Sequence, residues 1–222
     1  MAGGAPAGAT DAGAASPALR ADVERLASLL DDWGRRYLTR DWRPALEAVR
    51  AASGEVESLF ARLAALGDPA ELLSAAAPLG ASGFHWALDL HALIDFRAFK
   101  PAADALCRAS EASGAPEVVR ASCAFAAGLA LIETGLRPQA RPLLERTLAL
   151  RTRVLGVNSR EALDVQHLLG VGKYFLRAYD EAEGVLRAAY EGRKRLLGPG
   201  DASTLLTLQY LAACVGLTGK ER

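Results

Sequence analysis

Residues Leu143 to Gly198 read LLERTLALRTRVLGVNSREALDVQHLLGVGKYFLRAYDEAEGVLRAAYEGRKRLLG, and this stretch decides the fold. One phrase occurs twice in it, since Val154-Leu155-Gly156 and Leu196-Leu197-Gly198 each precede a polar turn and a helical run. The two glycines are 42 residues apart, and the same step back leads to Gly114. A fixed period of this size predicts a solenoid of stacked helix pairs, in which each pair buries its apolar faces against its neighbours.

Each period divides into two expected helices, which we call A and B in chain order. In the first full repeat, 114–155, Ala115-Pro116-Glu117 opens helix A, Gly135 ends it near 134, and helix B covers about 139–154. In the second repeat, 156–197, a capping box from Asn158 to Glu161 opens a helix A that runs to about 176. Helix B follows there from Tyr179 to about 196. A partial copy, 198–222, contains helix A over about 202–217.

A trimmed copy, 82–113, is expected before the first full repeat. Its first helix is predicted over the apolar run from 82 to 99, and Lys100-Pro101 opens a shorter second helix that ends near 112. When Phe99 is aligned with Tyr179, the small and apolar positions of the two B helices also coincide: Ala102 with Ala182, and Leu106 with Leu186.

The chain before these repeats divides into two parts. Residues 1–17 contain mostly small side chains and one charge, Asp11, so we expect a disordered tail. Residues 18–81 show apolar side chains at helical spacing and are expected to form N-terminal helices. Ser53-Gly54 interrupts the second apolar stripe, which predicts either two helices or one kinked helix. Gly67-Asp68-Pro69 starts the next helix, with Asp68 as its cap.

Composition limits the classes of partner. The 222 residues carry 26 basic and 26 acidic side chains, so the net charge of zero gives no overall attraction to nucleic acid or to an anionic membrane. No apolar run reaches the length of a membrane span, which is about 18 residues or more. The N-terminus lacks a basic region and a leucine-rich core, which argues against a secretory signal.

Three cysteines, Cys107, Cys123 and Cys214, are widely spaced and form no CxxC pair. This pattern argues against a disulfide framework and against a zinc site. A reducing compartment fits best, and we expect a cytoplasmic protein.

The B-helix residues resemble a known family. Tyr179-Asp180-Glu181-Ala182 is followed by Leu186, Ala189 and Leu197-Gly198, and the preceding copy has Ala140, Leu144, Leu148-Ala149-Leu150-Arg151 and Leu155-Gly156. This pattern is similar to the tetratricopeptide repeat of the 42-residue kinesin light chain type, over roughly 114–220, with a weaker echo over 82–113. The resemblance implies an all-α, right-handed superhelical solenoid of antiparallel helix pairs.

Helix A has a small residue at its middle in every copy: Gly128, Gly170 and Ala212. We expect each to face the alanine of helix B, so that the two helices approach closely.

Two features that serve ligands in the family are missing from this chain. Helix A often carries an asparagine pair for bound peptide, but here those positions hold Phe125-Ala126, His167-Leu168 and Gln209-Tyr210. The Asn/Lys cluster that clamps a C-terminal carboxylate in other tetratricopeptide repeats is also absent. Both departures weaken a kinesin cargo role and a chaperone-tail role.

The family geometry implies a concave face lined by helix A positions. This mostly apolar face suits an amphipathic helix or an apolar linear motif of a protein partner. The sequence therefore predicts a non-catalytic interaction scaffold without a cofactor, and the alternative is a regulatory or structural subunit of a larger enzyme complex. The expected peptide-binding groove consists of Ser122, Phe125, Leu129, Glu133, Asp164, His167, Val171, Tyr174, Leu206 and Gln209, together with Ala213.

Metal and phosphate chemistry are weakly indicated. His85 and Asp89 share a helix face, but His91 points elsewhere, so ordinary helix histidines are the better interpretation and no metal site is predicted. A helical enzyme that uses His85 and Asp89 is the remaining catalytic hypothesis. The clusters around Arg151 and around Arg193 alternate with acids, which is typical of a solvated surface.

The partial copy has an apolar helix A with no second helix to pack against it. Its helix A is apolar on several sides, whereas terminal repeats normally show a polar outer face. We expect that the helix is an imperfect cap, that the natural protein continues beyond Arg222, or that another chain docks there, including by self-association. The apolar residues are Leu205, Leu206, Leu208, Leu211, Val215 and Leu217.

Overall fold

The computed structural model describes residues 15–36, 42–81, 84–89 and 94–219, and the expected tail lies outside these residues except for its last three positions. The described chain is all-α, and consecutive helices pack against one another as an array of helix pairs, which confirms the predicted fold class. Its eleven described helices are α1 Pro17–Arg36, α2 Trp42–Ala51, α3 Ser53–Ala64, α4 Pro69–Gly80, α5 His85–Asp89, α6 Phe96–Ala112, α7 Glu117–Glu133, α8 Arg137–Leu155, α9 Arg160–Phe175, α10 Tyr179–Leu197 and α11 Ala202–Thr218.

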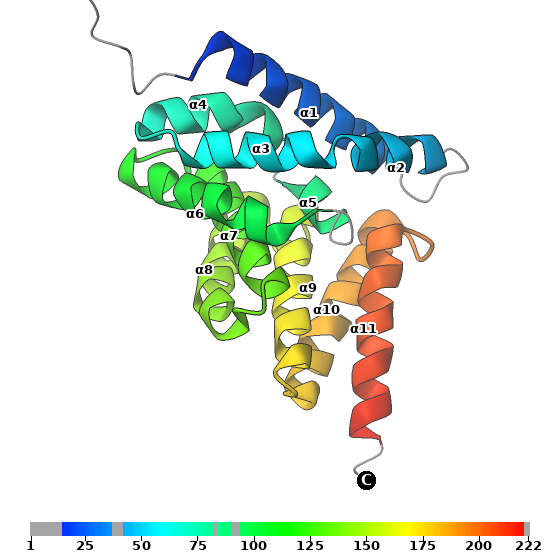
Figure 1. The fold of residues 1–222 in the computed structure, drawn as a ribbon. Helices are drawn as coiled ribbons and strands as arrows, with labels where there is room; N and C mark the ends of the chain where they lie inside the picture. The colour runs from blue at the N-terminus through cyan, green and yellow to red at the C-terminus, as the bar shows by residue number, and fades with distance from the viewer. Residues whose placement is uncertain (1–14, 37–41, 82–83, 90–93, 220–222) are drawn as a thin grey trace, which may run out of the picture.

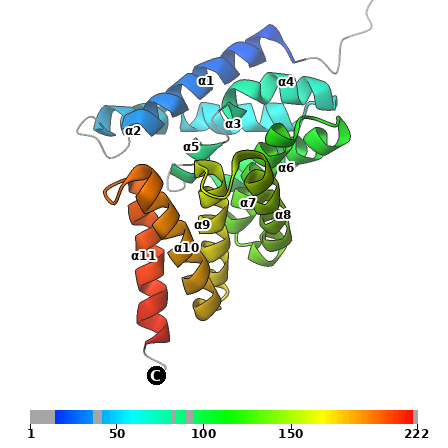
Figure 2. The same cartoon turned by 180° about the vertical axis from the view of Figure 1, so that it is seen from behind.

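Two sets of helices run in different directions (Figure 1). Helices α1, α3 and α4 lie across one end, and α7 to α11 extend away from them. Within the second set, α9 and α11 stand in front of α10 in Figure 1, and the view from behind brings α8 and α10 forward (Figure 2). The A helices α7, α9 and α11 therefore share one face of the array, and the B helices α8 and α10 form the other.

The helix starts follow from local capping. Asp68 accepts a hydrogen bond from the backbone N–H of Glu71 at 2.8 Å, as predicted, and Pro69 occupies the first turn of α4. At α9 the cap is Ser159 rather than the predicted Asn158, and its Oγ accepts from the N–H of Ala162 at 3.2 Å. Either side chain can cap a helix, and the turn after Gly156 brings Ser159 into register.

The turns between helices repeat with the same period. Gly156 and Gly198 end α8 and α10 with φ values of 93° and 95°, a left-handed region that favours glycine. Gly135 has a φ of 83° in the turn after α7, but the equivalent position after α9 holds Arg177, with a φ of 63°. The second A-to-B turn therefore places a residue with a Cβ where the first uses glycine.

The trimmed copy differs from the prediction. A single helix was expected over 82–99, with a break at Lys100-Pro101. In the structure, the chain forms the five-residue α5 instead, and α6 then starts at Phe96 with Asp95 as its cap and continues through Pro101. Pro101 is the sixth residue of α6, so the helix loses one backbone hydrogen bond there but remains anchored by buried Phe96 and Phe99. The shortened element is thus the first helix of this copy.

One hydrophobic core joins the N-terminal helices to the array. It extends from Ala15, which lies just before α1, to Val171 in α9, and it includes fully buried Phe60, Leu63 and Phe99. A second, smaller cluster lies between α10 and α11 and consists of Ala182, Leu186, Leu211 and Cys214. The break at Ser53-Gly54 gives two helices, α2 and α3, on either side of Ala52.

The small residues of the A helices contact a leucine of helix B rather than the expected alanine. A Cβ placed on Gly128 would lie 2.5 Å from Leu144 Cδ2, and a Cβ on Gly170 would lie 2.5 Å from Leu186 Cγ. The close approach of helices A and B was correctly predicted, but the contacting residue of helix B stands four positions after the alanine. Ala140 and Ala182 are themselves fully buried.

Candidate partner-binding surface

Two buried arginines join successive repeats. Arg151 in α8 and Arg193 in α10 are 42 residues apart and almost entirely buried. Arg151 donates to the carbonyl oxygen of Glu161 at 2.8 Å, and Arg193 donates to that of Ser203 at 2.7 Å. Each B helix is thereby tied to the first turn of the next A helix. Burial lowers the pKa of Arg151 to about 10. The prediction of a solvated surface is wrong for these two arginines, whereas the basic residues around them are exposed: Arg153, Arg160, Lys194 and Arg195.

Asp164 in α9 is the acidic partner inside this joint. It forms an ion pair with Arg193 and a close contact with Nδ1 of His85, which comes from α5. Burial alone would raise the pKa of Asp164, but the attraction of Arg193 and the hydrogen bond from His85 lower it far below its usual value. Nε2 of His85 also lies 3.7 Å from Oε1 of Glu161. The contacts of His85 therefore attach α5 to α9.

Thr207 extends the same network into α11. Its hydroxyl accepts from Arg193 at 2.7 Å, donates to the carbonyl of Ser203 at 2.8 Å, and lies 3.3 Å from Nδ1 of His167. The polar side chains of the network thus hold α5, α9, α10 and α11 together. Asp164 and His167, which were predicted to contact a peptide, are used within the fold.

The predicted groove residues divide by exposure. Five of them are buried, with no side chain more than 4% exposed, because α5 packs against α7 and the A helices contact one another directly. Ser122 is half-buried, and its hydroxyl donates to the carbonyl of Val118 at 3.0 Å. The buried five are Phe125, Leu129, Asp164, His167 and Val171.

The other predicted residues reach the surface. Glu133 and Gln209 are exposed, and Tyr174 and Leu206 are half-buried, as is Ala213. Glu133 and Tyr174 lie in the last turns of α7 and α9, whereas Leu206, Gln209 and Ala213 lie along the middle of α11. The open part of the A-helix face therefore consists of the C-terminal ends of α7 and α9 and the adjoining side of α11.

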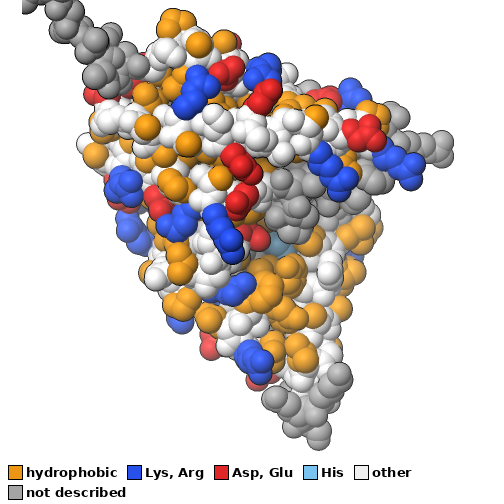
Figure 3. All heavy atoms as spheres, in the orientation of Figure 1, with side chains coloured by type: hydrophobic (Ala, Val, Ile, Leu, Met, Phe, Trp, Pro, Cys, Tyr) orange, Lys and Arg blue, Asp and Glu red, His pale blue; other side chains and the backbone are white. Residues whose placement is uncertain are grey.

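An aromatic cluster occupies this open part of the face. Tyr174 and Phe175 end α9, and Tyr210 approaches them from α11 with ring centroids 5.6 Å and 6.2 Å away. Tyr179 joins from α10 at 5.7 Å from Tyr174. Arg137, which begins α8, places its guanidinium 4.2 Å from the centroid of the Phe175 ring. We call Tyr174, Phe175 and Tyr210 the aromatic cluster. Figure 3 shows hydrophobic side chains gathered on this side, over the lower parts of α9 and α11.

Sequence reasoning identified Tyr174 but missed Phe175 and Tyr210. Phe175 stands 42 residues after Glu133, so the period that defined the groove would have found it. The ring of Phe175 is 45% exposed, which is unusual for phenylalanine and makes it available to a partner. Burial, with the nearby carboxylate of Glu133, raises the pKa of Tyr210, so its hydroxyl stays protonated at neutral pH.

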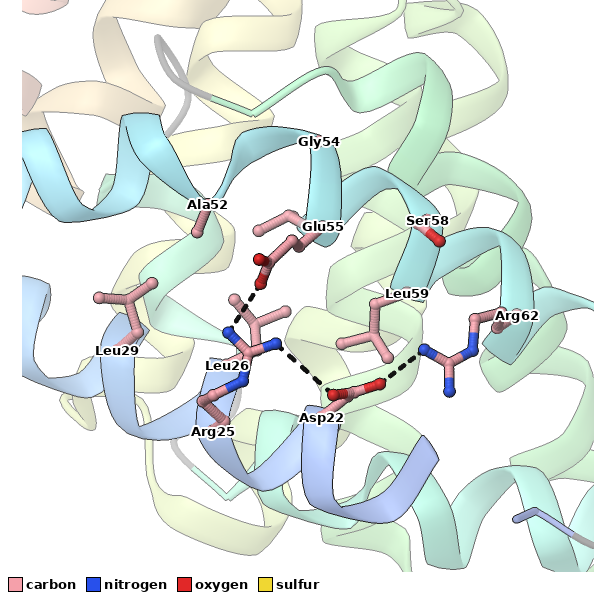
Figure 4. A pocket seen from close by; sticks show the side chains of 11 residues that line it. Asp22, Arg25, Leu26, Leu29, Ala52, Gly54, Glu55, Ser58, Leu59 and Arg62 are labelled. Carbon is pink, nitrogen blue, oxygen red and sulfur yellow. Dashed lines mark hydrogen bonds and ion pairs between the residues drawn. The ribbon is translucent and has the colours of Figure 1, made fainter. Parts of the chain in front are cut away.

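Two larger hollows lie elsewhere on the described surface. One, of about 380 Å³, separates α1 from α3, and Arg25 and Asp22 there pair with Glu55 and Arg62 at 2.7 Å each (Figure 4). The other, of about 480 Å³, lies among α6, α7 and α8 and contains the ion pairs of Glu111 with Arg146 and Glu117 with Arg153. Acidic and basic side chains are paired in both hollows, so neither presents a surface of one charge sign to a ligand.

The residues that the structure describes contain no group of three or more His, Cys, Asp or Glu side chains that could hold a metal ion. His91 and the side chain of Asp89 lie outside the described residues. Cys107, Cys123 and Cys214 are free thiols. Within the described helices, none has both the length and the apolar character of a membrane span.

Comparison with known proteins agrees with the repeat geometry. Residues 121–161, which cover most of α7, all of α8 and the start of α9, match the family model of the tetratricopeptide repeat. No curated protein sequence matches the chain at a significant level. Tetratricopeptide repeats generally mediate protein–protein interactions and are generally non-catalytic.

Proposed function

We propose that this chain is a non-catalytic scaffold that binds a peptide or helix of a partner protein on the open part of its A-helix face. The observation that carries the proposal is the aromatic cluster. Tyrosine and other aromatic residues are enriched at the centres of protein interfaces, because they bury a large area at little entropic cost. Three such side chains from two A helices converge here without being covered by α5.

The chemistry around the cluster specifies the kind of segment. The surface offers aromatic rings, the half-buried Leu206, the amide of Gln209, and one charge of each sign from Glu133 and Arg137. An apolar linear motif or an amphipathic helix fits such a mixed surface better than an acidic tail does. We also infer that the repeats belong to the 42-residue kinesin light chain type, on the basis of their period, with a ligand different from those that an asparagine pair would hold.

A cytoplasmic location is part of the proposal. All three thiols are free, two of them are buried, and burial raises the pKa of Cys123 to about 11, which keeps it protonated and unreactive. Such thiols fit a reducing compartment.

The experiment is affinity purification of partners followed by mass spectrometry. We expect the double variant Tyr174→Ala/Tyr210→Ala to lose the specific partner while retaining the helical circular dichroism of the wild type. Tyr190→Ala, which removes a half-buried tyrosine from α10 outside the cluster, is the matched control and should retain the partner.

The outcome also separates the competing functions. Equal recovery of the partner by the double variant and the wild type would overturn the proposal for this surface. Stoichiometric co-purification with the subunits of an enzyme, unaffected by the cluster, would favour the alternative of a regulatory or structural subunit.

A further inference from the structure

The outer face of α11 is an apolar stripe. Leu205, Leu208, Ala212 and Val215 recur at helical spacing on one side of the helix. The two leucines are 44% and 37% exposed, and Val215 is 43% exposed. An adjacent side of α11 carries the buried Thr207, Leu211 and Cys214 and packs against α10 and α9. We call the four exposed residues the α11 stripe.

The repeat period shows what normally covers this face. In α9 the equivalent residues are Leu163, Gln166, Gly170 and Lys173, and they face α10. A Cβ on Gly170 would collide with Leu186, and Lys173 pairs with Glu181. In α7 the equivalent Gly128 lies against Leu144 of α8. Each A helix thus receives an antiparallel helix whose leucine lies over its small residue, and within the described part of the chain α11 receives none.

The composition of the stripe argues against simple exposure to water. Leu208 and Val215 stand where the covered face of α9 has Gln166 and Lys173. The uncovered helix is therefore more apolar than its covered counterpart, which is the reverse of a solvated terminal repeat. A contiguous exposed apolar surface of this kind indicates an interaction site.

The order of residues in the stripe fits a second copy of itself. If two α11 helices pack antiparallel about a two-fold axis near residue 210, Leu208 of each copy lies over Ala212 of the other, and Leu205 lies beside Val215. Within the chain, the B helix supplies the leucine and the A helix supplies the small residue, as in Leu144 against Gly128. In the dimer, each copy of α11 would supply both. No charged side chain of the stripe opposes the pairing.

We propose that the α11 stripe is the interface of a symmetric homodimer, in which the α11 helices of two copies pack antiparallel. Such an interface is isologous, because the same patch is used on both subunits. One helix face of about three turns is small, and interfaces that bury less than about 1,200 Å² in total are typically weak. The dimer should therefore form reversibly as the protein concentration rises. The interface is separate from the aromatic cluster and does not depend on the partner proposed there.

Sedimentation equilibrium of the full chain tests the proposal. The wild type should show a monomer–dimer equilibrium. The variant Leu208→Gln/Val215→Lys places the residues of α9 at the equivalent positions of α11, so it should stay folded and remain monomeric at every concentration. Leu196→Gln, which changes an exposed leucine at the end of α10, is the control and should dimerise like the wild type.

Three outcomes would overturn the proposal. A wild type that is monomeric at every concentration would show that the α11 stripe contacts a different protein or solvent instead of a second copy. Dimerisation of the double variant would place the interface elsewhere. Loss of dimer in Leu196→Gln would show that the effect is not confined to the stripe. Circular dichroism of each variant separates loss of association from loss of structure.

Discussion

At the scale of single residues, the absence of a side chain at Gly170 sets the distance between α9 and α10. We expect Gly170→Ala to destabilise the chain by about 1–3 kcal/mol, because the new Cβ would meet Leu186 at 2.5 Å and the core has no room to relax. Denaturant unfolding measures the change in the free energy of unfolding.

Gly184 provides the matched control for this substitution. It lies inside α10, is exposed, and has no heavy atom within 4 Å of an added Cβ. Gly184→Ala should leave stability unchanged or raise it by about 0.5–1 kcal/mol, since alanine is the better helix former. A Gly170→Ala protein as stable as Gly184→Ala would contradict the close packing of α9 on α10.

Asp164 predicts a specific dependence of stability on pH. Its pKa is lowered in the folded state, so its contribution to stability is present above the unfolded value, 3.8, and is lost as the pH falls through the folded value. Asp164→Asn leaves the buried charge of Arg193 without its counter-ion and should cost about 3–5 kcal/mol at neutral pH. The difference between wild type and variant should shrink below about pH 4.

Urea unfolding of both proteins across that pH range provides the measurement. Asp31→Asn, at an exposed position inside α1, is the control and should follow the wild type. A constant gap between wild type and Asp164→Asn down to low pH would show that Asp164 is not charged in the fold.

At the scale of helices and turns, Arg177 is a strained connection between α9 and α10. Its φ of 63° is costly for a residue with a Cβ, and the equivalent turn after α7 uses Gly135. We expect Arg177→Gly to raise stability by up to about 1 kcal/mol, partly offset by the greater freedom of glycine in the unfolded chain. Thermal melting checks the sign.

The control for this substitution is the same exchange within a helix. Arg195→Gly lies in α10, where glycine has no conformational advantage, and should lower stability by about 1 kcal/mol. If both variants melt below the wild type, the backbone of Arg177 is not strained.

The helices that the sequence predicted well are those in which period and capping agree. The start at Asp68 and the ends at Gly135, Gly156 and Gly198 were recognisable because each residue type has a local backbone reason to stand there. The start of α10 at Tyr179 has no side-chain cap and was recognisable from the repeat pattern alone. The split of the trimmed copy into α5 and α6 was not predictable in this way. Apolar residues on several sides of that run resemble one buried helix, and its actual break depends on where Phe84 and Phe96 find cover in the core.

The candidate site was predictable in outline only. The period placed Gln209 on the open part of the A-helix face, and Tyr174, which stands one position before the periodic equivalent of Glu133, is half-buried there beside Phe175.

Whether Phe125 would be exposed depended on α5, a distant segment whose His85 ring lies 6.4 Å from the Phe125 ring. His167 is buried against Thr207 and Tyr210 of α11. Truncation of Phe125, which the sequence placed in the peptide-binding groove, should therefore cost stability.

At the scale of the whole molecule, the core is larger at one end. The main cluster unites α1 to α9, whereas α10 and α11 share a smaller one. We expect native-state hydrogen exchange to show the amides of α11 opening first and those of α3, α6 and α7 opening only on global unfolding. The measurement is best made on the monomeric Leu208→Gln/Val215→Lys variant, so that association does not protect α11. Equal protection of α11 and α6 would contradict this order.

The arginine joints have a consequence for how such a chain changes length. Arg151 and Arg193 close two successive junctions with the same bond, to a carbonyl ten residues further along. Residues 156–197 therefore begin and end at junctions of the same kind. A tandem duplication of this segment would form the same arginine-to-carbonyl hydrogen bond at each new junction. Among the described helices before α7, the equivalent position in α6 holds Ala109 instead of an arginine, and these helices share one core. Duplication of residues 156–197 would therefore move the α11 stripe farther from α1 and leave both unchanged.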